Sequence, residues 1–194
     1  MSIRLGVMAS GRGSNFQAIQ TEIEKGSLNA EIALLISDRE NAPALEIARG
    51  HGIEARAYPY DKQNRVAFET AAGDAFECAD CDYIILAGFM RILTPAFIDR
   101  FAGRILNIHP SLLPSFKGLH PQQQALDAGV KFSGCTVHLV TQELDAGPIL
   151  AQAVVPVFEM DTEEDLSHRI LEQEHRVYAE AINVLTERTS SCAS

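Results

Sequence analysis

Short runs of apolar residues alternate along this chain with segments in which apolar residues recur every three or four positions. The first pattern is typical of buried strands, and the second of helices that pack one face against a core. The apolar runs predict strands at residues 3–9, 31–37, 54–58, 83–87, 104–108, 134–140 and 149–157. The helical spacing predicts helices around the stripe Phe16, Ile19 and Ile23, at residues 42–49, 65–76 and 122–128, and from Thr162 onward.

This alternation predicts an α/β fold with a doubly wound, mostly parallel central sheet, and it leaves an antiparallel arrangement of the later strands open. The 194 residues suffice for one well-buried domain, and no repeat or low-complexity linker divides them. Thr162 is the expected N-cap of the last helix, with acidic residues in the first turn and an apolar stripe of Leu166, Ile170, Val177, Ala181 and Val184 or Leu185. The small polar residues 189–194 are expected to fray.

Charge and composition narrow the classes of function. The formal net charge of −10 argues against nucleic acid or an anionic membrane as the main partner. No apolar run approaches about 18 residues, and residues 1–4 lead into a strand without a signal-peptide pattern, so we expect a cytoplasmic protein. Cys78 and Cys81 are separated by two residues, but no second cysteine pair or histidine spacing completes a metal site, so no metal is expected.

Asn107 and His109 end one predicted strand and are the first candidates for chemistry. Residues two apart on a strand point to the same face, so both side chains can reach one atom. Pro110 holds His109 in an extended conformation, and ligands of open α/β sheets bind beyond the carboxyl ends of strands. Locally, the same two residues are also compatible with a purely structural role at the strand end.

Residues 10–15, Ser-Gly-Arg-Gly-Ser-Asn, connect the first strand to a helix. The glycines let backbone N–H groups approach an anion at the helix N-terminus, which suits a phosphate. Phe16 stands where a dinucleotide fingerprint has its third glycine, although Asp38 lies where a ribose-binding acid would be. A nucleotide-binding oxidoreductase and a non-catalytic phosphate-binding module therefore remain alternatives.

Asp145 and Glu174 are the candidate carboxylates. Asp145 precedes the turn at Gly147 and Pro148, where aspartate often caps backbone, but beside His109 it would orient the imidazole and favour its charged form. An amide, an imidazole and a carboxylate together suit acyl transfer. Glu174 lies at the edge of the last helix's apolar stripe, so it should be partly exposed or bonded to a polar group.

Together these motifs resemble the phosphoribosylglycinamide formyltransferases, the folate-dependent glycinamide ribonucleotide transformylase family of purine synthesis. The matching segments are residues 10–15, 86–93, 107–114, 118–120, 134–148 and 173–175. The resemblance extends from residue 3 to about residue 185. It implies one formyltransferase domain over 1–194, with a Rossmann-type phosphate-binding half at about 1–103 and a catalytic and folate half at about 104–188. Leu171, in place of a polar residue, and Gln142, in place of an acidic one, depart from the pattern.

The resemblance also implies a reaction, in which the formyl group of 10-formyltetrahydrofolate passes to the amine of glycinamide ribonucleotide. It implies a ribonucleotide site at Gly11, Arg12, Gly13, Ser14, Asn15 and Glu174, a folate site at Arg65, Met90, Arg91, Ile92, Leu93, Asn107 and Asp145, and a catalytic set of Asn107, His109 and Asp145. The partners would be these small molecules, acting on a monomer or homodimer. A 10-formyltetrahydrofolate hydrolase and another folate-dependent formyltransferase are the alternatives; those relatives usually carry an extra domain, for which we expect no room here.

Overall fold

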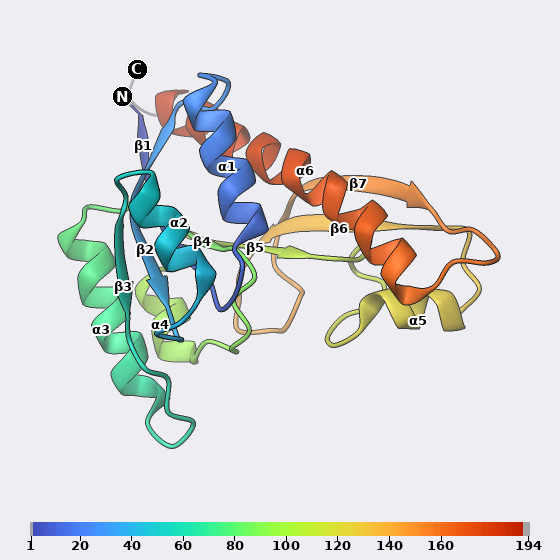
Figure 1. The fold of residues 1–194 in the computed structure, drawn as a ribbon, viewed down its shortest axis with the longest axis horizontal. Helices are drawn as coiled ribbons and strands as arrows, with labels where there is room; N and C mark the ends of the chain where they lie inside the picture. Colours follow the sequence, from blue (N-terminus) through green and yellow to red (C-terminus); the bar gives the residue numbers. More distant parts are fainter. Residues whose placement is uncertain (1, 192–194) are drawn as a thin grey trace.

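The computed structural model describes residues 2–191, with side chains described through residue 186. Within this part, the strands form one seven-stranded sheet in the order β3-β2-β1-β4-β5-β6-β7 (Figure 1). The strands are β1 (Ile3–Met8), β2 (Ala30–Ser37), β3 (Glu54–Ala57), β4 (Tyr83–Leu86), β5 (Ile105–His109), β6 (Phe132–Leu139) and β7 (Ile149–Pro156). The helices are α1 (Ser14–Glu24), α2 (Pro43–Gly50), α3 (Arg65–Cys78), α4 (Pro95–Arg100), α5 (Pro121–Asp127) and α6 (Glu163–Ser191).

The sheet confirms the predicted fold class. Strands β1 to β5 pair in parallel, and β6 and β7 are antiparallel, as the sequence analysis left open. The chain builds outward from β1 to β3 and then returns to place β4 on the other side of β1. This reversal of strand order creates a crevice at the carboxyl ends of β1 and β4, where open α/β sheets bind ligands.

Apolar residues fill both faces of the sheet. One cluster joins the sheet to α1, α2 and α6 through Phe16, Leu45 and Ile182. The other joins it to α3 and α4 through Phe76 and Phe97. Burial on both faces explains why the parallel strands read as continuous apolar runs rather than as alternating ones.

Two helical details differ from expectation. The segment containing Pro95 was given no helix in the sequence analysis, but it forms α4, because proline fits the first turn of a helix and the Thr94 hydroxyl accepts from the Phe97 amide at 3.3 Å. The end of the chain was expected to fray from residue 189, but α6 continues to Ser191; residues 192–194 lie outside the described part.

The predicted start of α6 is confirmed. The Thr162 hydroxyl accepts from the Asp165 amide at 3.2 Å, and the Asp165 carboxylate accepts from the Thr162 amide at 2.9 Å. These reciprocal bonds have the form of a capping box, with Asp in place of Glu. The predicted stripe is buried, with Leu185 rather than Val184 as its last member. No helix within residues 2–191 has both the length and the apolar character needed to cross a membrane.

Tyr178 anchors α6 to the centre of the sheet. Its side chain is fully buried, and its hydroxyl lies 3.1 Å from the Leu86 carbonyl oxygen and 3.0 Å from that of Leu106. Leu86 ends β4 and Leu106 lies in β5, so the hydroxyl bridges the two strands beneath the crevice. Burial raises the pKa of Tyr178 well above its ordinary value, which keeps the hydroxyl a donor.

Tyr178→Phe should therefore lower the free energy of unfolding by about 1–3 kcal/mol, because a buried carbonyl loses its donor. Urea denaturation followed by circular dichroism measures this loss. Tyr83→Phe is the matched control, because no hydrogen bond to its hydroxyl occurs among the side-chain bonds of residues 2–186. Equal effects of the two substitutions would contradict the anchoring role of the Tyr178 hydroxyl.

Candidate active site

A cleft of about 600 Å³ opens at the carboxyl ends of the central strands. Its walls are the loop after β4, the end of β5, residues 118–122 and residues 140–145. Of the residues predicted from the sequence, the cleft brings together Asn15, Met90, Arg91, Ile92, Leu93, Asn107, His109, Asp145 and Glu174. Gly11, Arg12, Gly13, Ser14 and Arg65 do not line it.

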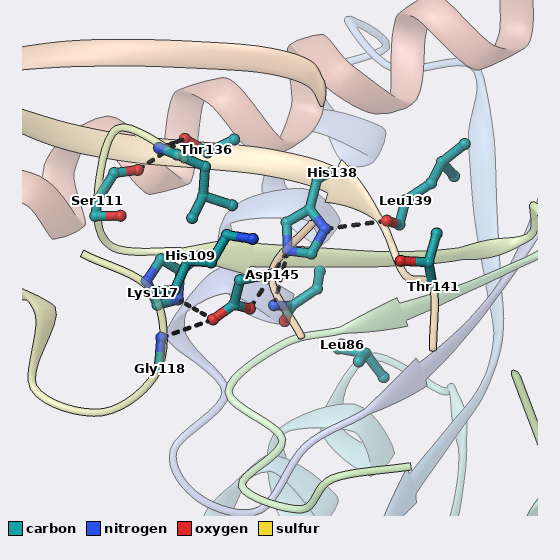
Figure 2. Close-up of polar contacts among 12 residues, drawn as sticks. Leu86, His109, Ser111, Lys117, Gly118, Thr136, His138, Leu139, Thr141 and Asp145 are labelled. Atoms are coloured by element: carbon teal, nitrogen blue, oxygen red, sulfur yellow. Dashed lines mark hydrogen bonds and ion pairs between the residues drawn. The ribbon is translucent and has the colours of Figure 1, made fainter. Parts of the chain in front are cut away.

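His109 and Asp145 face each other inside this cleft, and both are buried (Figure 2). The Nδ1 atom of His109 lies 3.5 Å from Oδ2 of Asp145. The Nε2 atom lies 2.9 Å from the carbonyl oxygen of Phe116, which can only accept, so Nε2 carries a proton. The imidazole is therefore oriented by its Nε2 bond, and its Nδ1 atom is directed toward the carboxylate.

His138 is a further member of this cluster, which the sequence analysis did not single out. It lies opposite Asn107 in the antiparallel β5–β6 pair, where its Nε2 atom is 3.3 Å from the Asn107 amide nitrogen and 3.8 Å from Oδ1 of Asp145. Its Nδ1 atom donates to the Leu139 carbonyl at 3.0 Å. Burial lowers the pKa of His138, so the neutral ring accepts from Asn107 and fixes the direction of that amide.

A tight turn holds Asp145 in place. Its backbone has a positive φ of 48°, and its Oδ2 atom accepts from the Gly118 amide at 2.9 Å. A Cβ atom added to Gly147 would lie 1.8 Å from the Leu139 carbonyl oxygen, so only glycine allows the turn to pack this closely on β6. Asp145 does bond to backbone, as turn aspartates often do, but it bonds to a distant loop while facing two histidines.

Residues 10–13 form a loop that leads into α1, as expected, and Ser14 and Asn15 begin the helix. Gly13 precedes the helix with a φ of 69°, and a Cβ atom there would lie 2.9 Å from the Ala44 Cβ atom. Because glycine supplies no capping side chain, the first amides of α1 remain available to an anion. Asn15 is buried in the first turn and donates to Oε2 of Glu174 at 2.8 Å, which links this loop to α6.

Asp38 does not serve as a ribose-binding acid. Its side chain is fully buried and accepts from Nε of Arg91 at 2.7 Å, while the Arg91 guanidinium lies 4.5 Å from the centre of the Tyr60 ring. The Asp38 carboxylate therefore holds the loop after β4 through its bond with Arg91. This pairing removes the feature that kept the oxidoreductase alternative open.

The remaining sequence features do not belong to the cluster of Asn107, His109 and Asp145. Cys78 is exposed, and burial raises the pKa of Cys81 to about 11, so its thiol stays protonated and unreactive near neutral pH. Within the described residues, no group of three or more His, Cys, Asp or Glu side chains is placed to hold a metal ion. Gln142 lines the cleft and donates to Asp99 at 2.8 Å, whereas Leu171 is half-buried on α6 outside the cleft.

Comparison with known proteins identifies the family. The profile described as formyl transferase matches residues 3–182. The chain belongs to the formyl transferase family. Among its relatives, the phosphoribosylglycinamide formyltransferase of Escherichia coli is 43% identical over 89% of this chain and 82% of its own length. That of Bacillus subtilis is 40% identical over 94% of both chains.

Larger relatives and solved structures are also similar to this formyl transferase. It spans 18% of the trifunctional purine biosynthetic protein adenosine-3 of Bos taurus, at 43% identity. The crystal structure of glycinamide ribonucleotide transformylase 1 from Symbiobacterium toebii matches with a TM-score of 0.91 and 48% identity, over 96% of this chain and 88% of that one. A formyltetrahydrofolate deformylase from Pseudomonas syringae matches with a TM-score of 0.88 and 31% identity, over 94% of this chain and 60% of that one.

Glu174 is the most unusual carboxyl of this formyl transferase site. The sequence analysis expected it to be partly exposed or bonded to a polar group; it is buried and bonded to Asn15. Burial raises the pKa of Glu174, and the Asn15 hydrogen bond and the nearby His109 offset only part of this effect. A carboxyl with a raised pKa in the folded state favours folding at low pH, and this contribution is lost as pH rises toward the folded pKa.

Glu174→Gln keeps the side-chain size and the bond from Asn15 but removes the titrating group. The free energy of unfolding of the variant, relative to the wild type, should therefore increase as pH rises above the ordinary glutamate value of 4.5. Urea denaturation at pH values from 4.5 to about 8 measures this difference. Glu172→Gln, an exposed change on the same helix, is the control, and a difference independent of pH would contradict the prediction.

Proposed function

We propose that this protein transfers the formyl group of 10-formyltetrahydrofolate to the amine of glycinamide ribonucleotide, a step of purine synthesis. The observation that carries the proposal is one cleft lined both by the Asn107, His109 and Asp145 cluster and by Asn15, which lies in the first turn of α1. Relatives named for this reaction, at 40–48% identity, support the same assignment. As proposed, the enzyme is cytoplasmic and acts on small molecules as a monomer or homodimer.

The two substrates are assigned to different loops, one reached from the cleft through Asn15 and the other lining the cleft directly. The ribonucleotide phosphate binds the backbone of residues 11–15 beside Arg12, and Glu174 accepts hydrogen bonds from the ribose hydroxyls. The pterin ring binds the backbone of Met90 to Leu93, where the exposed side chains of Met90 and Ile92 supply apolar surface. Arg65, exposed at the start of α3, meets the carboxylate end of the folate.

The reaction begins when the neutral substrate amine attacks the formyl carbon. A new C–N bond forms, and the formyl oxygen becomes an oxyanion. Asn107 donates to this oxyanion from its amide, and protonated His109 donates from Nδ1, because Nε2 is already bonded to Phe116. Loss of one such donor typically raises the barrier by about 2.7–4 kcal/mol.

Collapse of this intermediate requires one proton to move from the attacking amine to the leaving folate nitrogen. Asp145 is placed to promote that transfer, through water, with its Oδ2 atom 3.5 Å from Nδ1 of His109. The bond between the formyl carbon and the folate nitrogen then breaks, which yields the formamide and tetrahydrofolate. The proton leaves one nitrogen and arrives at another, so no external acid or base is consumed.

A single assay tests the reaction. The protein is mixed with 10-formyltetrahydrofolate, with and without glycinamide ribonucleotide, and loss of the formyl group from folate is followed by absorbance. Loss that depends on the ribonucleotide is expected. Equal loss in its absence would assign the protein to hydrolysis, the reaction of the deformylase with a similar fold. No loss in either arm would contradict folate chemistry at this site.

Asp145→Asn should lower kcat by about 100-fold or more, because the amide keeps the bond from Gly118 but cannot accept the transferred proton. The Kd for glycinamide ribonucleotide, measured by calorimetry, should stay nearly unchanged. Glu143→Gln is the control, since the Glu143 side chain is exposed on the same loop and its ion pair among the described residues is with Lys117 across 3.4 Å. Turnover near the wild-type rate would refute the role given to Asp145.

A further inference from the structure

Ser10 joins the two loops that the proposed function assigns to different substrates. Its amide donates to the Gly88 carbonyl at 3.2 Å, and its hydroxyl accepts from the Met90 amide at 2.9 Å. Ser10 is buried, with 2% of its surface exposed, and it directly precedes Gly11. One residue thus fixes two backbone groups of the loop after β4 while it begins the loop before α1.

Two further contacts hold the loop after β4, and both come from other directions. The Asp38 carboxylate at the end of β2 accepts from Arg91. The Glu69 carboxylate in α3 accepts from the Thr94 amide at 2.9 Å and from the Thr94 hydroxyl. All three acceptors are buried. Of the three, Ser10 alone belongs to the segment that leads into α1.

This arrangement has a consequence for binding. An anion held by the amides of residues 11–15 restrains the backbone that carries Ser10, and Ser10 restrains the backbone of Gly88 and Met90. The Met90 amide is bonded to the Ser10 hydroxyl and is therefore not available to a ligand. The hydroxyl thus also determines which backbone groups of residues 90–93 face the cleft. A free-energy coupling between two sites must act equally in both directions.

We infer that Ser10 is a positioning residue through which ribonucleotide and folate each tighten the binding of the other. The inference rests on the proposed function, since it takes the two substrates and their two loops from it. Ser10 touches neither substrate in this scheme. Its hydroxyl transmits the restraint from the phosphate loop, residues 11–15, to the folate loop, residues 88–93.

The test uses tetrahydrofolate, the deformylated product, so that no turnover occurs. Calorimetry gives its Kd with and without saturating glycinamide ribonucleotide, and the wild-type protein should show a decrease of about 5-fold or more. Ser10→Ala should bring the two Kd values close together, mainly by weakening tetrahydrofolate binding in the presence of the ribonucleotide. Inorganic phosphate in place of the ribonucleotide should produce part of the wild-type effect.

Two control variants separate this role from a general loss of structure. Ser133→Ala removes a hydroxyl that is equally buried, at 1% exposure, and whose oxygen has no hydrogen-bond partner, so both Kd values should match the wild type. Asp38→Asn loosens the folate loop from its other side. It should raise both Kd values by the same factor and leave their ratio unchanged.

Each outcome either supports or overturns the coupling through Ser10. A wild-type ratio of one, or an unchanged ratio in Ser10→Ala, overturns the coupling. If Ser10→Ala does not fold, Ser10→Cys keeps the side-chain shape with a weak sulfur acceptor, and the same loss of coupling is required of it. Failure of the wild-type protein to bind glycinamide ribonucleotide at all would instead contradict the proposed function, so the two failures are distinct.

Discussion

The pairing of β1 with β4 at the centre of the sheet is the constraint on which the site depends. Because the two strands run in parallel, with Met8 beside Leu86, their loops leave from the same edge and meet within hydrogen-bonding distance. Strand β5 pairs with β4 on the far side and brings Asn107 and His109 to that edge. Without the reversal of strand order between β1 and β4, the two loops would lie under crossing helices instead of at an open crevice.

The antiparallel strands complete the cluster by a different route. Strand β6 carries the chain back toward the cleft, and its antiparallel register against β5 places His138 opposite Asn107, whereas β7 leads away again. The turn that precedes β7 then returns Asp145 to the histidines. Parallel strands alone would not supply this carboxylate, because their connections cross a face of the sheet and do not turn back at its edge.

Much of this architecture is readable from the sequence, and the exceptions have physical causes. Strand and helix order follow from apolar periodicity, and the capping box at Thr162 follows from local chemistry. His138 could not be assigned, because the register that pairs it with Asn107 depends on tertiary contacts. Asp38 was interpreted from the sequence as a candidate ribose ligand. Its partner in the fold, Arg91, lies 53 residues away in the chain, so the pairing could not be read from the local sequence. The folate-binding role of Arg65 rests on resemblance. Arg65 lies outside the cleft lining, so this role stays a prediction.

The buried carboxyl groups differ in their partners. Asp38 has a guanidinium partner, whereas Glu174 has only an amide, and burial raises the pKa of Glu174. Asp145 lies between these cases, bonded to a backbone amide and facing one histidine whose Nε2 proton is already committed and another kept neutral by burial. The Nδ1 atom of His109 faces the Asp145 carboxylate across 3.5 Å, so one edge of the sheet joins an amide, two imidazoles and a carboxylate. Under the proposed function, the amide and imidazole donors of this cluster serve an oxyanion in place of an activated serine.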